Sequence, residues 1–302
     1  MKINNISFFL ICIITLFFIF ILYNELNKYD GFSVNDGFTN NNKIPNIIHF
    51  CFLTENLEKA EEFYFFYYLA ILSAKLLNNP DKIYFYYNYE PYGKWWDSAK
   101  KLVTLEKVDV PEYWGKHQLI KMAHKADKIR MDKLYERGGI YLDMDTISVR
   151  SYAHLLNNEC VLGLEKDKNG KIIGICNAVM LTSPKSKFFK LWLLEYENHF
   201  VPNGWAEASI ILPYKIYENN KDTLTLLNNT SFFYPSWEEI DKIFKESAEI
   251  NSDLIVLHLW QSKSVQYLKN MNIQWVYNNK HTLYSKIIFK LITENKLLDY
   301  IR

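Results

Sequence analysis

The stretch from Gly138 to Asp145, with the sequence GGIYLDMD, constrains the fold more than any other part of the chain. A helical run ends at the glycine pair, and a short apolar strand then delivers two carboxylates. Alternation along a strand places Asp143 and Asp145 on one side and Met144 on the other. Two carboxylates this close repel each other unless a cation lies near them, and Mg²⁺ and Mn²⁺ prefer such oxygen ligands. The stretch therefore predicts a metal-phosphate anchor, with an Asp-rich turn after a strand as the alternative.

The bulk composition fits one large globular domain or two small ones. The chain has 302 residues, is 49% hydrophobic and carries a net charge of +1. Because nucleic-acid binding draws on a strongly basic surface, this balance gives it no electrostatic support. Aromatic residues make up 17% of the chain and could supply stacking surfaces for sugars or bases.

The amino-terminal segment reads as a membrane anchor. Residues 6–23 are nearly all apolar, and a helix rising about 1.5 Å per residue would just cross a bilayer core. No small-x-small cleavage site follows, which favours an uncleaved signal anchor over a signal peptide. We expect a cytoplasmic tail (1–5), a transmembrane signal anchor (6–23), a flexible stem (24–42) and a globular domain (43–302). The chain would then be a single-pass type II membrane protein, with its globular domain in a Golgi- or ER-like lumen or outside the cell.

The globular part alternates strands and helices, which predicts an α/β fold with a mixed, mostly parallel sheet flanked by helices. We expect strands at residues 46–53, 82–87, 103–108, 161–165, 172–182 and 254–258, besides the one after the glycine pair. We expect helices at residues 57–77, 94–101, 186–199, 209–219, 237–246 and 284–300, and one long helix or a helix pair at 116–136.

Two charged residues precede the glycine pair on the same helix face. Asp127 and Arg130 are three positions apart, and the helix that carries them ends where the Asp143 strand begins. Both groups could therefore lie beside the metal site. The planar fork of arginine suits a phosphate or a pair of sugar hydroxyls, and aspartate suits sugar hydroxyls. The alternative is a solvent-facing ion pair worth about 0.5 kcal/mol.

A third constellation lies near the carboxyl end, where the sequence reads HLWQSKS from His258 to Ser264. Strand alternation places His258 and Trp260 on one side. A neutral imidazole is a reasonable third ligand for Mn²⁺, and the Ser and Lys beyond it could meet phosphate oxygens. The alternative is a histidine with a purely structural role at a strand end.

From Ala126 to Asp145 the pattern A-D-x-x-R-x-x-x-L-Y-x-x-G-G-I-Y-L-D-x-D resembles the core of the glycosyltransferases with a DXD sugar-binding region. It looks most like the α1,4-galactosyltransferase and α1,4-N-acetylglucosaminyltransferase group, with initiating α1,6-mannosyltransferases and clostridial glucosylating toxins as further relatives. Other segments agree in order: residues 44–50 with an I-P-k-I-I-H strand, 177–184 with N-G-x-f…p, 233–235 with f-Y-P and 257–264 with H-x-W-x-x-x-S.

The resemblance implies a GT-A fold and a metal-dependent, retaining transferase. Such an enzyme would move a hexose or N-acetylhexosamine from a UDP-linked nucleotide sugar to a glycan, glycolipid or glycoprotein acceptor, in α linkage. Carried over by position, Asp143, Asp145 and His258 would hold Mn²⁺ (or Mg²⁺) and the donor diphosphate. Asp127 and Arg130 would contact the donor sugar.

The resemblance also implies further donor contacts. Ile48 and His49 would border the nucleotide base, Asn177 would face the donor sugar, and Ser264 would lie near the phosphates. The family's Q-G-P-like turn has no clear counterpart, and the corresponding stretch is residues 205–209, where Glu207 could take the role of the Gln.

Retention of configuration allows two routes. Glu207 could be a covalent nucleophile, as in retaining glycosidases. Alternatively the acceptor attacks on the face that the diphosphate leaves, and an oxygen of the leaving group takes its proton. We favour the second route, because the sequence offers no secure nucleophile.

Two other functions compete with the transferase. A phosphatase of the D-x-D-x-T type is disfavoured because Ile147 stands where that pattern needs Thr and no matching downstream Lys and paired-Asp segment stands out. A membrane-anchored carbohydrate-binding protein with an inactive transferase fold is the remaining alternative. The retained Asp and Arg pair, the D-x-D and the late His argue against it.

Overall fold

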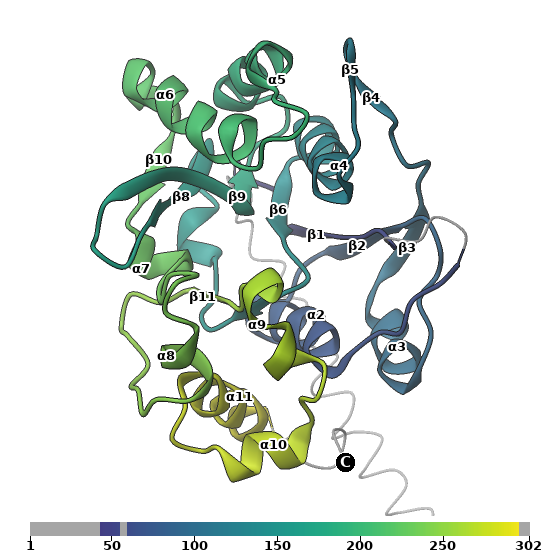
Figure 1. Cartoon of the computed structure of the whole chain (residues 1–302), viewed down its shortest axis with the longest axis vertical. Coiled ribbons are helices and arrows are strands. Elements are labelled where there is room, and N and C mark those ends of the chain that lie inside the picture. The colour runs from purple at the N-terminus through teal and green to yellow at the C-terminus, as the bar shows by residue number, and fades with distance from the viewer. Residues whose placement is uncertain (1–42, 55–58, 296–302) are drawn as a thin grey trace, which may run out of the picture. The chain divides into compact units, whose positions relative to one another are not determined.

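The computed structural model describes residues 43–54 and 59–295 (Figure 1). The predicted tail, signal anchor and stem lie outside these residues. Within the described ranges, no helix is both long and apolar enough to cross a membrane.

A seven-stranded sheet lies at the centre of the described part. It contains β1 (Ile47–Phe52), β2 (Lys82–Tyr87), β3 (Thr104–Lys107), β6 (Gly139–Leu142), β8 (Cys160–Lys166), β9 (Ile172–Thr182) and β10 (Thr225–Leu227). Their order is β10-β8-β9-β6-β1-β2-β3 (Figure 1). The pairs β1–β2, β2–β3, β1–β6 and β8–β10 are parallel, whereas β9 runs antiparallel to both β6 and β8. The predicted mixed, mostly parallel sheet is confirmed.

Helices cover both faces of this sheet. On one face packs α2 (Phe65–Asn78), in which every residue from Phe65 to Ala74 is buried. On the other face pack α4 (Met122–Arg137) and α5 (Lys187–His199). Strand alternation supplies both cores: on β1, Phe50 faces the α2 side and Cys51 the α4 side.

The remaining elements lie around the sheet. They are α3 (Lys94–Ala99), η1 (Lys100–Leu102), β4 (Tyr113–Trp114), β5 (His117–Gln118), β7 (Thr146–Ser148), η2 (Ala153–Leu155), η3 (Glu207–Ile211), α6 (Leu212–Asn219), η4 (Lys221–Thr223), α7 (Asn229–Phe232), α8 (Ile240–Phe244), β11 (Val256–His258), α9 (Gln261–Leu268), α10 (Ile273–Asn278) and α11 (Leu283–Glu294).

Several predicted helices have different bounds. The predicted helix at 116–136 starts too early. The β4–β5 hairpin occupies the beginning of that range, and α4 begins only at Met122. The hairpin turns at Gly115, whose φ of 55° favours glycine. It is held by Trp114, which stacks on Tyr196 of α5 with ring centroids 3.6 Å apart. This contact is tertiary and leaves no local signal in the sequence.

The glycine pair ends α4 and starts β6, as predicted. Gly138 has a φ of 65° and Gly139 a φ of 108°, a region that residues with a side chain rarely adopt. A Cβ at position 139 would lie 2.5 Å from the carbonyl oxygen of Ile47. Glycine there lets β6 lie against β1, and β1 and β9 on its two sides fix where β6 ends.

Candidate active site

The two carboxylates of the D-x-D follow β6 in a turn rather than in a continuing strand. The backbone N–H of Thr146 donates to the carbonyl of Asp143 (3.1 Å), and the Thr146 hydroxyl donates to the same oxygen (2.7 Å). Met144 is buried in the core on the α2 side of the sheet. The turn therefore keeps the expected separation, with Met144 packed inward and Asp143 and Asp145 together on the other side.

His258 reaches these carboxylates through a second, two-stranded sheet. Strand β11 pairs antiparallel with β7, and this register puts His258 opposite Thr146, next to Asp145. The imidazole Nε2 lies 3.4 Å from Oδ1 of Asp145. One ligand atom from each of Asp143, Asp145 and His258 lies within 4.8 Å of the other two. Two carboxylate oxygens and an imidazole nitrogen form a donor set that suits Mn²⁺ or Mg²⁺.

Each carboxylate of the pair has its own cationic or hydrogen-bonding partner. Oδ1 of Asp143 accepts from Arg130 Nη1 (2.9 Å) and from the Tyr141 hydroxyl (2.7 Å). Burial raises the pKa of Asp143, and Arg130 offsets only part of that effect. Oδ2 of Asp145 accepts the backbone N–H of Gln261 (2.7 Å).

The charges of Asp145 and His258 support each other. Burial acts to raise the pKa of Asp145, but the imidazole of His258 and the Gln261 amide outweigh it and hold that pKa below its ordinary value. Burial likewise opposes protonation of His258, yet Asp145 beside it raises the pKa of the imidazole. A divalent cation bound here would take the place of the imidazolium proton as the counter-charge.

Asp127 and Arg130 lie behind the D-x-D on α4, in a buried network. Arg130 Nε lies 3.5 Å from Oδ1 of Asp127, and the same oxygen accepts from Asn177 Nδ2 (2.8 Å). Oδ2 of Asp127 accepts from the Tyr196 hydroxyl (2.9 Å). Arg130 Nη1 also donates to the Asn177 carbonyl (3.2 Å). The alternative of a solvent-facing ion pair is wrong, since both side chains are at most 8% exposed.

The most accessible part of this group is the D-x-D itself. The side chains of Asp143 and Asp145 are 23% and 13% exposed, whereas those of Arg130 and His258 are 8% exposed. A substrate would therefore reach the carboxylates first, with the cations behind them. This arrangement can bind a metal ion together with an anionic ligand on the open side.

Comparison with known proteins agrees with this geometry. Residues 41–162 match the family described as "Glycosyltransferase sugar-binding region containing DXD motif". The chain is 31% identical over 253 residues to "Glucan organizing enzyme 1" of Cryptococcus neoformans var. grubii serotype A, an alignment that covers 79% of this chain and 68% of that protein. The chain belongs to the DXD sugar-binding-region glycosyltransferase family. Members of this family use a divalent metal ion and a nucleotide-sugar donor.

Three solved glycosyltransferase structures are similar at low identity. GlyE of Streptococcus pneumoniae TIGR4, in its apo form, is 15% identical with a TM-score of 0.47, covering 83% of this chain and 64% of that one. The galactosyltransferase LgtC, in complex with donor and acceptor sugar analogues, is 13% identical with a TM-score of 0.42, covering 70% and 86%. The PaToxG glycosyltransferase is 17% identical with a TM-score of 0.39, covering 59% and 70%.

Three residues predicted to contact the donor of this glycosyltransferase are fully buried. Ile48 packs in the core on the α2 side, and the ring of His49 bonds to the Tyr86 hydroxyl and the Gly138 carbonyl, both at 2.8 Å. The Ser264 hydroxyl donates to the carbonyls of Leu259 (2.6 Å) and Trp260 (3.0 Å). All three hold the frame of the site, and their contact with a nucleotide stays a prediction.

Glu207 lies at the start of η3, near the amino end of α4. Its Oε2 accepts the backbone N–H groups of Trp205 (2.8 Å) and Ala206 (3.1 Å). Glu207 lies outside the group formed by Asp143, Asp145 and His258. Its side chain closes a turn here, and its catalytic role stays a prediction.

Three further residues of the network were missed in the sequence. The Tyr141 hydroxyl bonds to Asp143, and strand alternation two positions earlier could have indicated that contact. Tyr196 and Gln261 reach Asp127 and Asp145 from distant segments. For these two no local pattern exists, because the packing of α5 and the β11–α9 corner decides the contacts.

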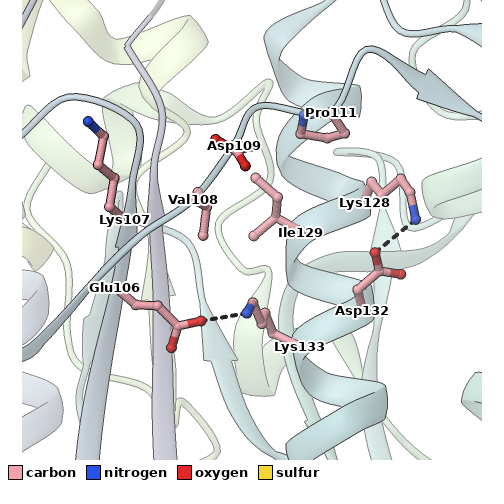
Figure 2. A pocket seen from close by; sticks show the side chains of 9 residues that line it. All are labelled: Glu106, Lys107, Val108, Asp109, Pro111, Lys128, Ile129, Asp132 and Lys133. Carbon is pink, nitrogen blue, oxygen red and sulfur yellow. Dashed lines mark hydrogen bonds and ion pairs between the residues drawn. The ribbon is translucent and has the colours of Figure 1, made fainter.

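A separate pocket lies between the carboxyl end of β3 and α4 (Figure 2). Its charged lining includes two ion pairs, Lys133 with Glu106 and Lys128 with Asp132. None of the predicted site residues lines it. The D-x-D group therefore remains the candidate active site.

Proposed function

We propose that this glycosyltransferase is metal-dependent and retaining, and that it transfers a hexose or N-acetylhexosamine from a UDP-linked sugar to a glycan acceptor in α linkage. The observation that carries the proposal is the convergence of ligand atoms from Asp143, Asp145 and His258. The likeness of the chain to the α1,4-glycosyltransferase group supports the retaining outcome and the α linkage.

Asp143, Asp145 and His258 would hold the metal ion and, through it, the donor diphosphate. When bound, the ion supplies Lewis-acid neutralisation of the charge that develops on the leaving diphosphate. Arg130 and Tyr141 both engage Oδ1 of Asp143, and Oδ2 takes no hydrogen bond from the residues that the structure describes. Oδ2 is therefore the oxygen of Asp143 that would face the ion.

Attack by the acceptor on the face that the diphosphate leaves is the route that the contacts favour. A covalent route needs a carboxylate free to attack the anomeric carbon. Both oxygens of Asp127 already accept hydrogen bonds, from Asn177 and Tyr196. Glu207 accepts two backbone N–H groups. Neither carboxylate is thus poised as a nucleophile, whereas a leaving diphosphate carries its own proton acceptor.

The compartment is part of the proposal and rests on the sequence alone. The apolar run at residues 6–23 would anchor the protein as a type II membrane protein. The catalytic domain would then act on glycans, glycolipids or glycoproteins in a Golgi- or ER-like lumen or outside the cell.

The test is nucleotide release by the full chain in detergent. UDP-glucose, UDP-galactose, UDP-N-acetylglucosamine, UDP-N-acetylgalactosamine and GDP-mannose are offered with Mn²⁺, and then with EDTA. We expect hydrolysis of at least one UDP-sugar, lost with EDTA and restored by added Mn²⁺, and an α-configured product by NMR. No turnover of any donor, with glycan binding intact, would leave the carbohydrate-binding alternative.

A further inference from the structure

Three exposed apolar residues lie just beyond the amino end of α4, on two segments that Lys121 links. They are Trp205 (60% exposed), Ile120 (65%) and Val201 (44%). Lys121 joins these segments: its Nζ donates to the Gly204 carbonyl (2.6 Å) and lies 5.7 Å from the centroid of the Trp205 ring. Clustered apolar side chains on a surface are typical of a binding site, whereas single ones are not.

The loop that carries Trp205 is held firmly in place. Glu207 accepts the Trp205 and Ala206 N–H groups, and the Ser209 hydroxyl donates to the Trp205 carbonyl (3.1 Å). One turn further on, Trp192 Nε1 donates to the Ala208 carbonyl (2.8 Å). A ring fixed in this way binds a ligand without a large loss of conformational entropy.

These residues lie on the same edge of the sheet as the D-x-D. Helix α4 ends where β6 begins, and Arg130 meets Asp143 at the other end of β6, so the helix and the strand run in opposite directions. From Arg130, α4 continues nine residues back to Lys121, a further 13 Å or so beyond Asp143 at about 1.5 Å per residue. Ligands of open α/β sheets bind outside the carboxyl ends of the strands, which is where these residues lie.

We propose that Trp205, with Ile120 and Val201 on the adjoining segments, is the platform on which a pyranose ring of the acceptor glycan stacks. The inference rests on the proposed transferase function and names the side from which the acceptor enters. The C–H face of a pyranose ring packs on the flat face of an indole, while its hydroxyls stay in water. The span from the platform to Asp143 leaves room for the donor sugar and the reacting end of the acceptor. Glu207 is then a positioning residue for Trp205.

The experiment compares KM values for acceptor and donor in the same variants of the full chain. The acceptor probes are p-nitrophenyl α- and β-glycosides of glucose, galactose and mannose, with maltose and lactose, and the donor is the one that the wild type hydrolyses. Trp205→Ala should raise the acceptor KM about tenfold and the donor KM far less. Trp205→Phe should keep most of the acceptor affinity because a ring remains. Leu194→Ala is the matched control, since Leu194 is an apolar residue 63% exposed on α5.

Two results would overturn the platform while leaving the transferase function intact. One is an acceptor KM for Trp205→Ala within about twofold of the wild type, a difference of under about 0.5 kcal/mol. The other is an equal rise of both KM values, which indicates general damage to the site. Failure of the proposed function is distinct, because the wild type itself would then hydrolyse no donor. Circular dichroism and the Tm check folding. If the alanine variant does not fold, Trp205→Gln carries the test, because it removes the ring but keeps a longer, polar side chain at this exposed position, and it should raise the acceptor KM in the same way.

Discussion

Arg130 Nη1 lies 2.9 Å from Oδ1 of Asp143, so a buried cation neutralises the first carboxylate of the D-x-D within the protein itself. His258 does the same for Asp145 at 3.4 Å. The mutual repulsion of the two carboxylates is therefore met by protein groups, which keep the pair assembled without a metal ion. We accordingly expect the fold to be independent of metal, whereas the proposed function makes turnover depend on it.

Arg130→Met should destabilise the protein strongly, because it leaves Asp127 and Asp143 buried without their cation. We expect the free energy of unfolding, measured with urea, to fall by about 3 kcal/mol or more. Lys100→Met is the control: it breaks a pair with Glu90 in which both side chains are more than 40% exposed, so it should cost under about 1 kcal/mol. Equal losses in the two variants would show that the Arg130 network does not stabilise the fold.

Asp145→Asn should abolish metal-dependent turnover and leave the fold intact. The amide keeps the size of the side chain and can still accept the Gln261 N–H, but it removes the charge that a divalent cation needs. Nucleotide release with Mn²⁺, Mn²⁺ affinity by calorimetry and the Tm are measured together. Asp132→Asn, in an exposed pair with Lys128, should change none of these. Wild-type activity in Asp145→Asn would refute the anchor assignment.

Gly139→Ala should disrupt the start of β6. The new Cβ would lie 2.5 Å from the carbonyl oxygen of Ile47, and the alanine would have to adopt a φ of 108°. We therefore expect the free energy of unfolding to fall by about 3 kcal/mol, or the protein to fail to fold. Gly170→Ala is matched for backbone strain: its φ is 83°, yet nothing lies within 4 Å of the added Cβ. It should therefore cost only about 1–2 kcal/mol. Urea unfolding measures the free energy of unfolding of both variants. Similar losses would mean that the close approach of β1 and β6 does not contribute to stability.

His49 should make stability depend on pH below neutrality. Burial lowers the pKa of its imidazole from 6.5 to about 4, although the hydrogen bond to Gly138 acts in the opposite direction. Between these values the unfolded chain binds the proton and the folded protein does not. The contribution of the neutral His49 to the free energy of unfolding is therefore complete above pH 6.5 and falls by about 3 kcal/mol as the pH drops to 4.

The free energy of unfolding is measured with urea from pH 7.5 to pH 4. His49→Gln should flatten the pH dependence relative to the wild type, whereas substitution of the exposed His154 by Gln should not. A wild-type slope retained in His49→Gln would contradict the assignment.

Removal of residues 1–42 should yield a soluble protein that still hydrolyses the donor. The backbone of Ile44 bonds to Leu156 and its side chain is fully buried, so the folded domain begins close to this point. Removing residues 1–50 instead deletes most of β1 from the sheet and should abolish folding. Donor hydrolysis and a cooperative urea transition distinguish the two truncated proteins. Failure of the shorter deletion to fold would contradict the predicted stem.

The sequence predicted regular elements best where the signal is local. The bounds of β2 and β9 agree with the predicted ranges to the residue, because β-branched, aromatic and other apolar residues dominate each of them. The predicted start of α4 is wrong because Trp114 stacks on Tyr196, a contact between segments far apart in the chain. The D-x-D was expected on a strand but lies in a turn, because β6 ends at Leu142.

The sequence by itself determined the centre of the candidate site: a glycine pair, two carboxylates one residue apart, and an Asp and an Arg on one face of the preceding helix. These features depend on covalent spacing and backbone geometry, which a sequence states directly. Only the tertiary structure decided which distant groups complete the site. The pairing of β7 with β11 brings His258 to Asp145, and the packing of α5 on α4 brings Tyr196 to Asp127. Such contacts depend on burial and register across the whole sheet, and no short stretch of sequence encodes them.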